Sequence, residues 1–104
     1  MISAKYTIER NKHTLVVLGH ANYAEYGKDI VCAGASALVQ ALIGWIDDSD
    51  CKVECISRDS INNEFIISCR GNADVEAAFT MAYIGLGQIA DSYPDHLHIE
   101  KIWE

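Results

Sequence analysis

A histidine and a cysteine near the start of the chain are the residues whose types and spacing can do chemistry. His20 follows Gly19, and Cys32 lies in residues 27–33, whose sequence is GKDIVCA. If Asp29 caps a helix, Cys32 falls near its first turn, where free backbone N–H groups and the helix dipole favour a thiolate over a thiol. A nearby imidazole can accept the thiol proton and later protonate a leaving amine, and the same N–H groups can stabilise an oxyanion. The segment therefore holds the parts of a Cys–His hydrolase.

By spacing alone, each of these residues also has a simpler interpretation. A buried cysteine packs as a small hydrophobic residue, and a histidine at a strand end often bonds only a carbonyl group. For Asp29 we favour a cap as the whole role, the alternative being that it also orients His20 as the third group of a triad. For Asn22 we favour a solvated loop amide over an orienting group or an oxyanion donor.

Alternating apolar and polar residues predict the strands that position this segment. The expected strands span residues 2–9, 13–18, 51–58, 64–70 and 97–103. One helix follows the second strand and another follows the fourth, so the order is ββαββαβ. This order predicts a single α+β domain over residues 1–104. We expect two layers, a mostly antiparallel sheet and two helices on one of its faces.

Each predicted helix has an apolar face at helical spacing. The face of the first helix, which begins after Asp29, consists of Val31, Ala35, Leu38, Leu42 and Trp45. The face of the second helix, which begins after Asn72 or Asp74 and ends before Pro94, consists of Val75, Phe79, Ala82, Leu86 and Ile89. Both helices are uncharged over long stretches, whereas an ordinary surface helix has a polar back. We therefore expect a homodimer in which a second copy covers part of them, the alternative being an exposed Ala/Gly surface.

Residues 30–46 also reach the lower length limit for a membrane span. The stretch contains Ser36 and Gln40, is followed by Asp47 and Asp48, and has no cluster of lysine or arginine at either end. A buried helix is therefore the favoured interpretation, and no membrane partner is expected.

The composition narrows the class of function. Fifteen acidic and eight basic residues give a net charge of −7, whereas a nucleic-acid binder needs a basic face. We expect no direct nucleic-acid partner, while a basic protein would be attracted. No secretory signal is visible near the N-terminus, and the four cysteines form no CxxC motif, so we expect reduced thiols in a cytoplasmic protein. The absence of CxxC also disfavours a thiol redox protein.

The remaining histidines and cysteines do not predict a metal site. His96 and His98 share a strand face, as do Cys51 and Cys55, but these spacings do not match a structural zinc site. We expect Cys51 and Cys55 to fill the core of the sheet. We expect His96 and His98 to face solvent and His13 to be an exposed edge residue. No metal and no cofactor is expected.

The segment around the histidine and the cysteine resembles the signature of the ribosomal-processing cysteine protease family (Prp). Members of this family pair a Gly-His motif with an Asp-Ile-Val-Cys-Ala motif across a loop of similar length, matched here by Gly19-His20 and by residues 29–33. The similarity extends to the residues just before the second motif, to the serine and its neighbours after it, and to the ββαββαβ order and total length. It therefore covers essentially the whole chain.

The resemblance implies a cysteine endopeptidase that removes the N-terminal extension of a large-subunit ribosomal protein, and it also implies a homodimer. Carried over by position, Cys32 is the nucleophile and His20 the general base. Asp29 matches the aspartate of the motif, and Ser36 matches a recurrent serine one turn beyond the cysteine. The acidic balance of the chain suits a basic N-terminal tail as substrate.

The loop between the two motifs is a candidate substrate loop. With Tyr23, Tyr26 and Gly27, it can close over a peptide and exclude water, the alternative being a static surface loop.

An alternative function is a non-catalytic acidic adaptor that binds a basic ribosomal or ribosome-assembly partner. It predicts binding that weakens with salt and survives the loss of Cys32. The protease instead predicts a partner with a shortened N-terminus.

Overall fold

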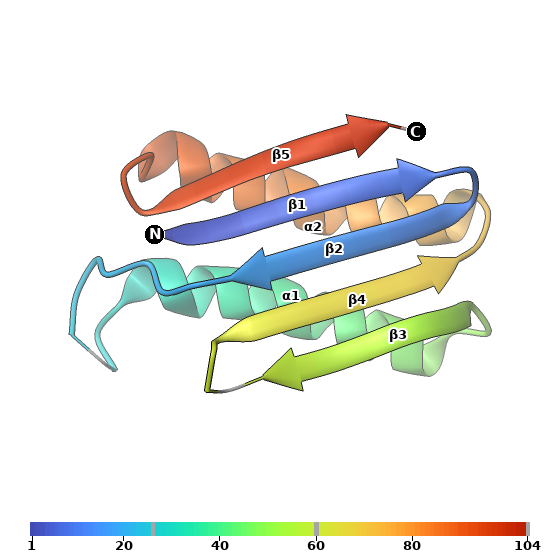
Figure 1. The fold of residues 1–104 in the computed structure, drawn as a ribbon, viewed down its shortest axis with the longest axis horizontal. Coiled ribbons are helices and arrows are strands. Elements are labelled where there is room, and N and C mark those ends of the chain that lie inside the picture. The colour runs from blue at the N-terminus through green and yellow to red at the C-terminus, as the bar shows by residue number, and fades with distance from the viewer. Residues whose placement is uncertain (26, 60, 104) are drawn as a thin grey trace.

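Figure 1 shows the fold in a computed structural model, in which residues 1–25, 27–59 and 61–103 are described. These residues form five strands and two helices in the predicted order ββαββαβ. The elements are β1 (Ile2–Glu9), β2 (Lys12–Leu18), α1 (Ile30–Asp48), β3 (Lys52–Asp59), β4 (Glu64–Arg70), α2 (Ala73–Ser92) and β5 (Leu97–Trp103). Every strand lies within one residue of its predicted ends, because alternation of apolar and polar residues marks it clearly.

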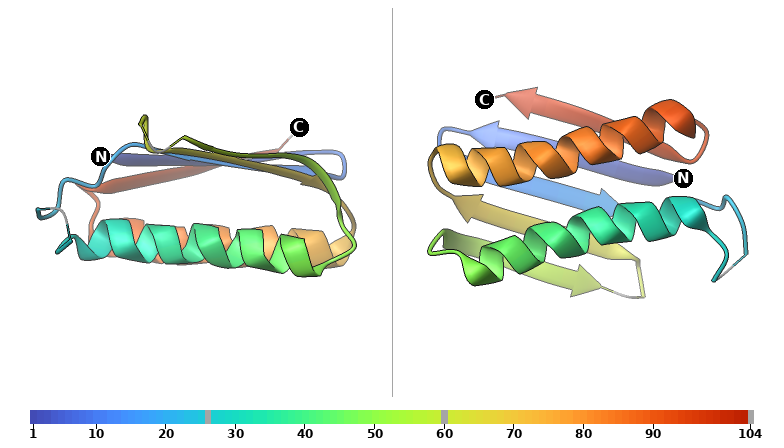
Figure 2. Two further views of the ribbon diagram at one scale, coloured as in Figure 1. Left: turned by 90° about the horizontal axis from the view of Figure 1, so that it is seen from below. Right: turned by 180° about the vertical axis from the view of Figure 1, so that it is seen from behind.

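The described strands form one sheet in the order β3-β4-β2-β1-β5. Neighbouring strands are antiparallel except β1 and β5, which are parallel. Both helices cover the same face of the sheet (Figure 2). The predicted two-layer α+β fold is therefore confirmed. The order places β1, β4 and β2 inside the sheet and leaves β3 and β5 as its edges.

The buried face of α1 differs in part from the predicted one. Leu38 and Trp45, expected within it, are only partly buried. The buried residues of this helix are Val31, Ala35, Val39, Leu42, Ile43 and Ile46. The difference has a physical reason, since α1 packs against α2 as well as against the sheet (Figure 2). Leu38 faces α2, where a Cβ on Gly85 would lie only 2.7 Å from its Cδ2 atom.

The second helix follows the prediction more closely. Its buried residues are Val75, Phe79, Ala82 and Leu86, and Ile89 is partly buried. By length and composition α1 could also span a membrane. A helix packed in a protein core meets the same criterion, and α1 buries one side between the sheet and α2.

The positions of several histidines and cysteines correct the expectations from sequence. His13, expected at an exposed edge, is only 3% exposed because it lies on the face of the inner strand β2 that α2 covers, where it packs against Phe79. Cys55, expected in the core, is exposed because β3 is an edge strand with little cover. Cys51 is partly buried. His98 is exposed as expected, whereas His96 is partly buried and bonded to the loop after β2.

Candidate active site

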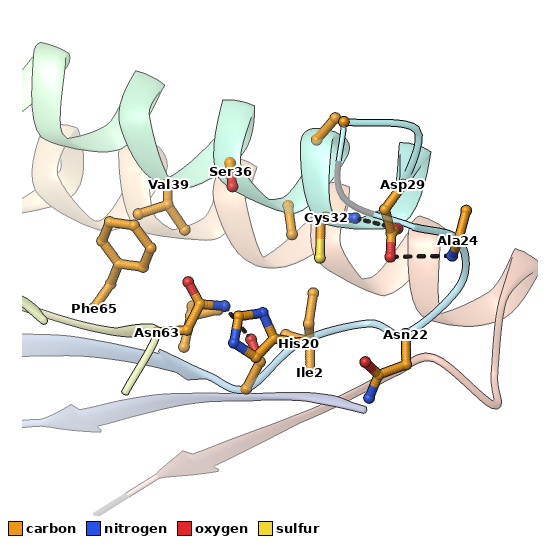
Figure 3. Close-up of a pocket in the computed structure, with 15 residues that line it drawn as sticks. Ile2, His20, Asn22, Ala24, Asp29, Cys32, Ser36, Val39, Asn63 and Phe65 are labelled. Carbon is orange, nitrogen blue, oxygen red and sulfur yellow. Dashed lines mark hydrogen bonds between the residues drawn. The ribbon is translucent and has the colours of Figure 1, made fainter. Parts of the chain in front are cut away.

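A cavity of about 640 Å³ opens between the start of α1 and the end of the sheet where β2 finishes. Figure 3 shows that its helix side carries Cys32 and Ser36, and that its sheet side carries His20 and Asn63. Its lining residues are Ile2, Val17, Gly19, His20, Asn22, Ala24, Gly27, Asp29, Cys32, Ala33, Ala35, Ser36, Val39, Asn63 and Phe65. The two chemically reactive residues of the sequence motifs are thus brought to one cavity.

Cys32 is held at the start of α1 by hydrogen bonds on both its backbone and its sulfur. Asp29 is the N-cap of α1, and its Oδ1 atom accepts a bond of 2.9 Å from the Cys32 N–H. The Cys32 Sγ atom accepts a bond of 3.4 Å from the Ala21 N–H. The side chain is partly buried and its sulfur points into the cavity (Figure 3). A bond to the sulfur and the positive end of the helix dipole both favour negative charge on it.

Asp29 joins the start of α1 to the loop after β2. While Oδ1 bonds to Cys32, Oδ2 accepts from the N–H groups of Tyr23 at 3.0 Å and Ala24 at 3.4 Å. The bond from the Cys32 N–H, followed by those from the loop, lowers the pKa of the Asp29 carboxyl. The predicted cap is confirmed. Because one carboxylate oxygen bonds to α1 and the other to the loop after β2, Asp29 holds the loop against the helix. We call this arrangement the Asp29 clamp.

His20 lies two residues beyond the end of β2, and its ring is exposed at the cavity. Figure 3 shows the ring on the sheet side and the Cys32 sulfur on the helix side of the same space. Within the described part of the chain the ring makes no hydrogen bond with another residue. Both ring nitrogens of His20 are therefore available to exchange a proton.

Gly19 sets the backbone path that leads to His20. Its φ is +95°, and a Cβ would lie 2.5 Å from the Met1 carbonyl oxygen, so another residue would be strained there. The Gly19 N–H donates to the Asn63 carbonyl at 3.1 Å, and the Asn63 side-chain amide donates back to the Gly19 carbonyl. This reciprocal pair fixes the backbone immediately before His20.

Three of the other predicted site residues line the same cavity: Asn22, Gly27 and Ser36. Ser36 lies one turn beyond Cys32, while the amide of Asn22 is turned away from the sulfur (Figure 3). In the loop predicted to bind substrate, Tyr23 packs edge-on against Tyr93 and does not line the cavity, whereas Gly27 lines it with a φ of +86°. Tyr26, predicted for the same loop, lies outside the described residues.

The sequence motifs do not contain the residues of the far wall. Asn63 and Phe65 lie on either side of Glu64, the first residue of β4. Phe65, Val17 and Val39 give the cavity an apolar end. Pairing of Leu18 with Glu64 brings this corner beside the end of β2. The local sequence does not predict that Asn63 and Phe65 lie beside the end of β2, because this contact depends on the order of the strands in the sheet.

The described residues contain no group of three or more His, Cys, Asp or Glu side chains that could hold a metal ion. The chemistry available at the cavity is that of the Cys32 thiol and the His20 imidazole. The N–H groups of Cys32 and Ala33 already donate to Asp29. The start of α1 therefore stabilises negative charge in the cavity mainly through the helix dipole.

Comparison with known proteins gives a consistent result. Residues 1–98 match the family described as cysteine protease Prp. The chain is 32% identical to the ribosomal processing cysteine protease Prp of Mycoplasma genitalium over 94 residues, which cover 90% of this chain and 93% of that protein.

Solved structures share the fold. The essential ribosomal processing protease Prp from S. aureus, in complex with a covalently linked product peptide, superposes with a TM-score of 0.87. The match has 26% identity and covers 97% of this chain and 99% of the other. A Streptococcus mutans protein at 23% identity matches in fold with a TM-score of 0.81, over 100% of this chain and 96% of the other.

Proposed function

The chain belongs to the cysteine protease Prp family, and from this premise we propose that it removes the N-terminal extension of a basic large-subunit ribosomal protein. Relatives of the chain are named ribosomal processing cysteine proteases, and one related structure holds a covalently linked product peptide. The single observation that carries the residue assignment is that Cys32 and His20 line one open cavity at the start of α1. Cys32 is the nucleophile and His20 the general base.

The proposed reaction proceeds through a thioester. His20 takes the proton of the Cys32 thiol, and the sulfur attacks the scissile carbonyl carbon to form a C–S bond. The protonated His20 then gives its proton to the leaving amine as the C–N bond breaks. His20 then takes a proton from water as the water oxygen attacks the thioester carbon, the C–S bond breaks to release the second product as a carboxylic acid, and the proton returns from His20 to the sulfur. The dipole at the start of α1 stabilises the negative charge that develops on the carbonyl oxygen.

The net charge of the whole chain supports a basic protein as substrate, and the lining of the cavity supports an apolar side chain near the scissile bond. The chain carries a net charge of −7, which attracts a basic tail and raises the encounter rate. The apolar end of the cavity at Val17, Val39 and Phe65 suits an apolar side chain near the scissile bond.

The test is to incubate the chain with the host's large-subunit ribosomal protein and to measure the mass of that protein. We expect a shortened N-terminus with the parent chain and with Cys55→Ala, a matched control at an exposed cysteine. With Cys32→Ala we expect the full-length mass. Cleavage by Cys32→Ala at the parent rate would contradict the nucleophile assignment. An uncleaved partner that binds the parent chain would instead indicate the adaptor function.

We also propose that the chain forms a homodimer through its helical layer. The outer surface of α2 exposes Met81 (73%) and Ile84 (51%), and Ile30 at the start of α1 is 56% exposed. Met81 and Ile84 are three residues apart and share one face of α2, and exposed apolar side chains that share a face are normally covered by a partner. We expect light scattering to give a dimer for the parent chain and a monomer for the double variant Met81→Asp, Ile84→Asp. A parent monomer at micromolar concentration would contradict this proposal.

A further inference from the structure

His96 lies outside both sequence motifs, yet it contacts the backbone beside the two reactive residues. It immediately precedes β5, and its Nδ1 atom lies 2.8 Å from the Ala21 carbonyl oxygen. A carbonyl oxygen can only accept a hydrogen bond, so Nδ1 carries a proton and donates. The contact joins the far edge of the sheet to the loop that follows His20.

Ala21 is bonded on both sides. Its N–H donates to the Cys32 Sγ atom, and its carbonyl accepts from His96. The residue is only 1% exposed, so solvent cannot replace either bond easily. Ala21 thus lies between the sulfur of the nucleophile and the His96 ring, and it directly follows His20.

The His96 ring is itself firmly placed. The His96 N–H donates to the Tyr93 carbonyl at 2.9 Å, and its carbonyl accepts from the Ile2 N–H at 2.9 Å. The ring also meets Tyr23 edge-on, with centroids 5.2 Å apart, and Tyr23 meets Tyr93 in the same way at 5.1 Å. His96 is therefore an anchor for the loop through one hydrogen bond and one aromatic contact.

We infer that His96 is a positioning residue of the active site, which acts through Ala21 to hold an N–H group on the Cys32 sulfur and to hold the backbone that carries His20. The inference rests on the proposed function. The His20 ring has no hydrogen-bonded partner among the described residues, so its position depends on the backbone on its two sides. Asn63 fixes the side of Gly19, and His96 fixes the side of Ala21.

Three substitutions separate the parts of this role. His96→Ala removes both the donor and the ring. His96→Phe keeps a ring against Tyr23 but cannot donate, whereas His96→Asn places an amide N–H near the position of Nδ1 and can still donate to Ala21. His98→Ala is the matched control, because this exposed histidine lies two residues further along.

The readout is the rate at which iodoacetamide alkylates each cysteine, measured by peptide mass spectrometry as a function of pH. Exposed Cys55 serves as the internal reference, and buried Cys69 reports any opening of the fold. In His96→Ala and His96→Phe we expect the ratio of Cys32 to Cys55 alkylation at neutral pH to fall about tenfold, because the Ala21 N–H is then no longer held on the Cys32 sulfur, where it favours the reactive thiolate. We expect the ratio to recover in His96→Asn, to be unchanged in His98→Ala, and Cys69 to stay protected throughout.

Two results would overturn the inference. One is an unchanged Cys32 ratio in both His96→Ala and His96→Phe, and the other is a fall seen only together with alkylation of Cys69. A parent chain whose Cys32 reacts no faster than Cys55 would instead contradict the proposed function. Peptide cleavage gives a second readout, with kcat expected to fall and KM to change less than about twofold, because the lost contact does not touch substrate.

Discussion

The two ends of β2 carry two histidines in opposite environments. His13, near the start of the strand, is 3% exposed, and its Nδ1 atom lies 2.6 Å from the Tyr6 hydroxyl. His20, just past the other end, is exposed and makes no hydrogen bond within the described part of the chain. One histidine is thus buried and hydrogen-bonded within β2, whereas the other lies exposed beyond its end with no hydrogen bond among the described residues.

The difference separates a histidine that stabilises the fold, His13, from one that can act as a general base, His20. Burial lowers the pKa of His13 and raises the pKa of Tyr6 to about 12, so both remain neutral at physiological pH. The phenol then donates to the imidazole, and Phe79 packs against both rings. A general base needs a nitrogen that is not already committed in this way. The free His20 ring meets that need, and the buried pair does not.

The largest effect is expected when the exposed ring of His20 is removed. We expect His20→Ala to lower kcat/KM for peptide cleavage roughly 10²–10⁴-fold, the range for loss of a general acid–base group. Because the ring is exposed and has no described partner, Tm should stay close to that of the parent chain. Cleavage kinetics and a thermal melt measure the two effects. Activity near the parent level would remove His20 from the base role.

The complementary change removes the buried ring. We expect His13→Ala to lower the free energy of unfolding by roughly 2–4 kcal/mol, because it leaves a cavity and an unpaired Tyr6 hydroxyl. Urea unfolding measures this loss. Cleavage by the fraction that remains folded should match the parent rate, since His13 does not line the active-site cavity. A loss of activity without a loss of stability would contradict the assignment of His13 to stability and of His20 to catalysis.

These two histidines also mark what the sequence could predict. Alternation predicts the strands, and Asp29 predicts the start of α1, so the place of Cys32 near the first turn follows from local pattern. The burial of His13 does not, because it depends on β2 being an inner strand and on α2 covering the face that carries this side chain. Local pattern describes a strand and its two faces, but not which strands flank it or which helix covers it.

The same limit applies to the cavity. Its motif residues lie close together in the sequence and are recognisable there. Asn63 and Phe65 belong to the hairpin formed by β3 and β4, and His96 precedes β5. Only the pairing of strands brings these residues to the cavity or to the backbone beside it. The buried face of α1 was shifted from its predicted position by a second neighbour, α2, which helical spacing does not include.

A smaller effect is expected on the pH dependence of stability, to which buried His13 contributes. The lowered pKa of His13 means that the unfolded chain binds a proton near the ordinary value of 6.5 while the folded chain does not. The contribution of this site is therefore complete above that value, and it is lost as pH falls below it. We expect urea unfolding to show a larger drop between about pH 7.5 and pH 5.5 for the parent than for His13→Asn, which cannot titrate. An equal drop in both chains would assign the dependence to the other histidines.

The smallest expected effect concerns the clamp between the loop and α1. The lowered pKa of Asp29 means that its charged form is the one that holds the N–H groups of Cys32 and Tyr23, so this support is present above the ordinary value of 3.8 and is lost as pH falls. Asp29→Asn keeps an acceptor for one bond but removes the charge and the second acceptor oxygen. We expect alkylation of Cys32 relative to Cys55 to slow severalfold at neutral pH. Asp47→Asn, the same change near the other end of α1, should leave that ratio unchanged, because the effect of a charge on a helix terminus fades within about one turn. Equal slowing in both variants would mean that net charge, not the clamp, controls the reactivity of the sulfur.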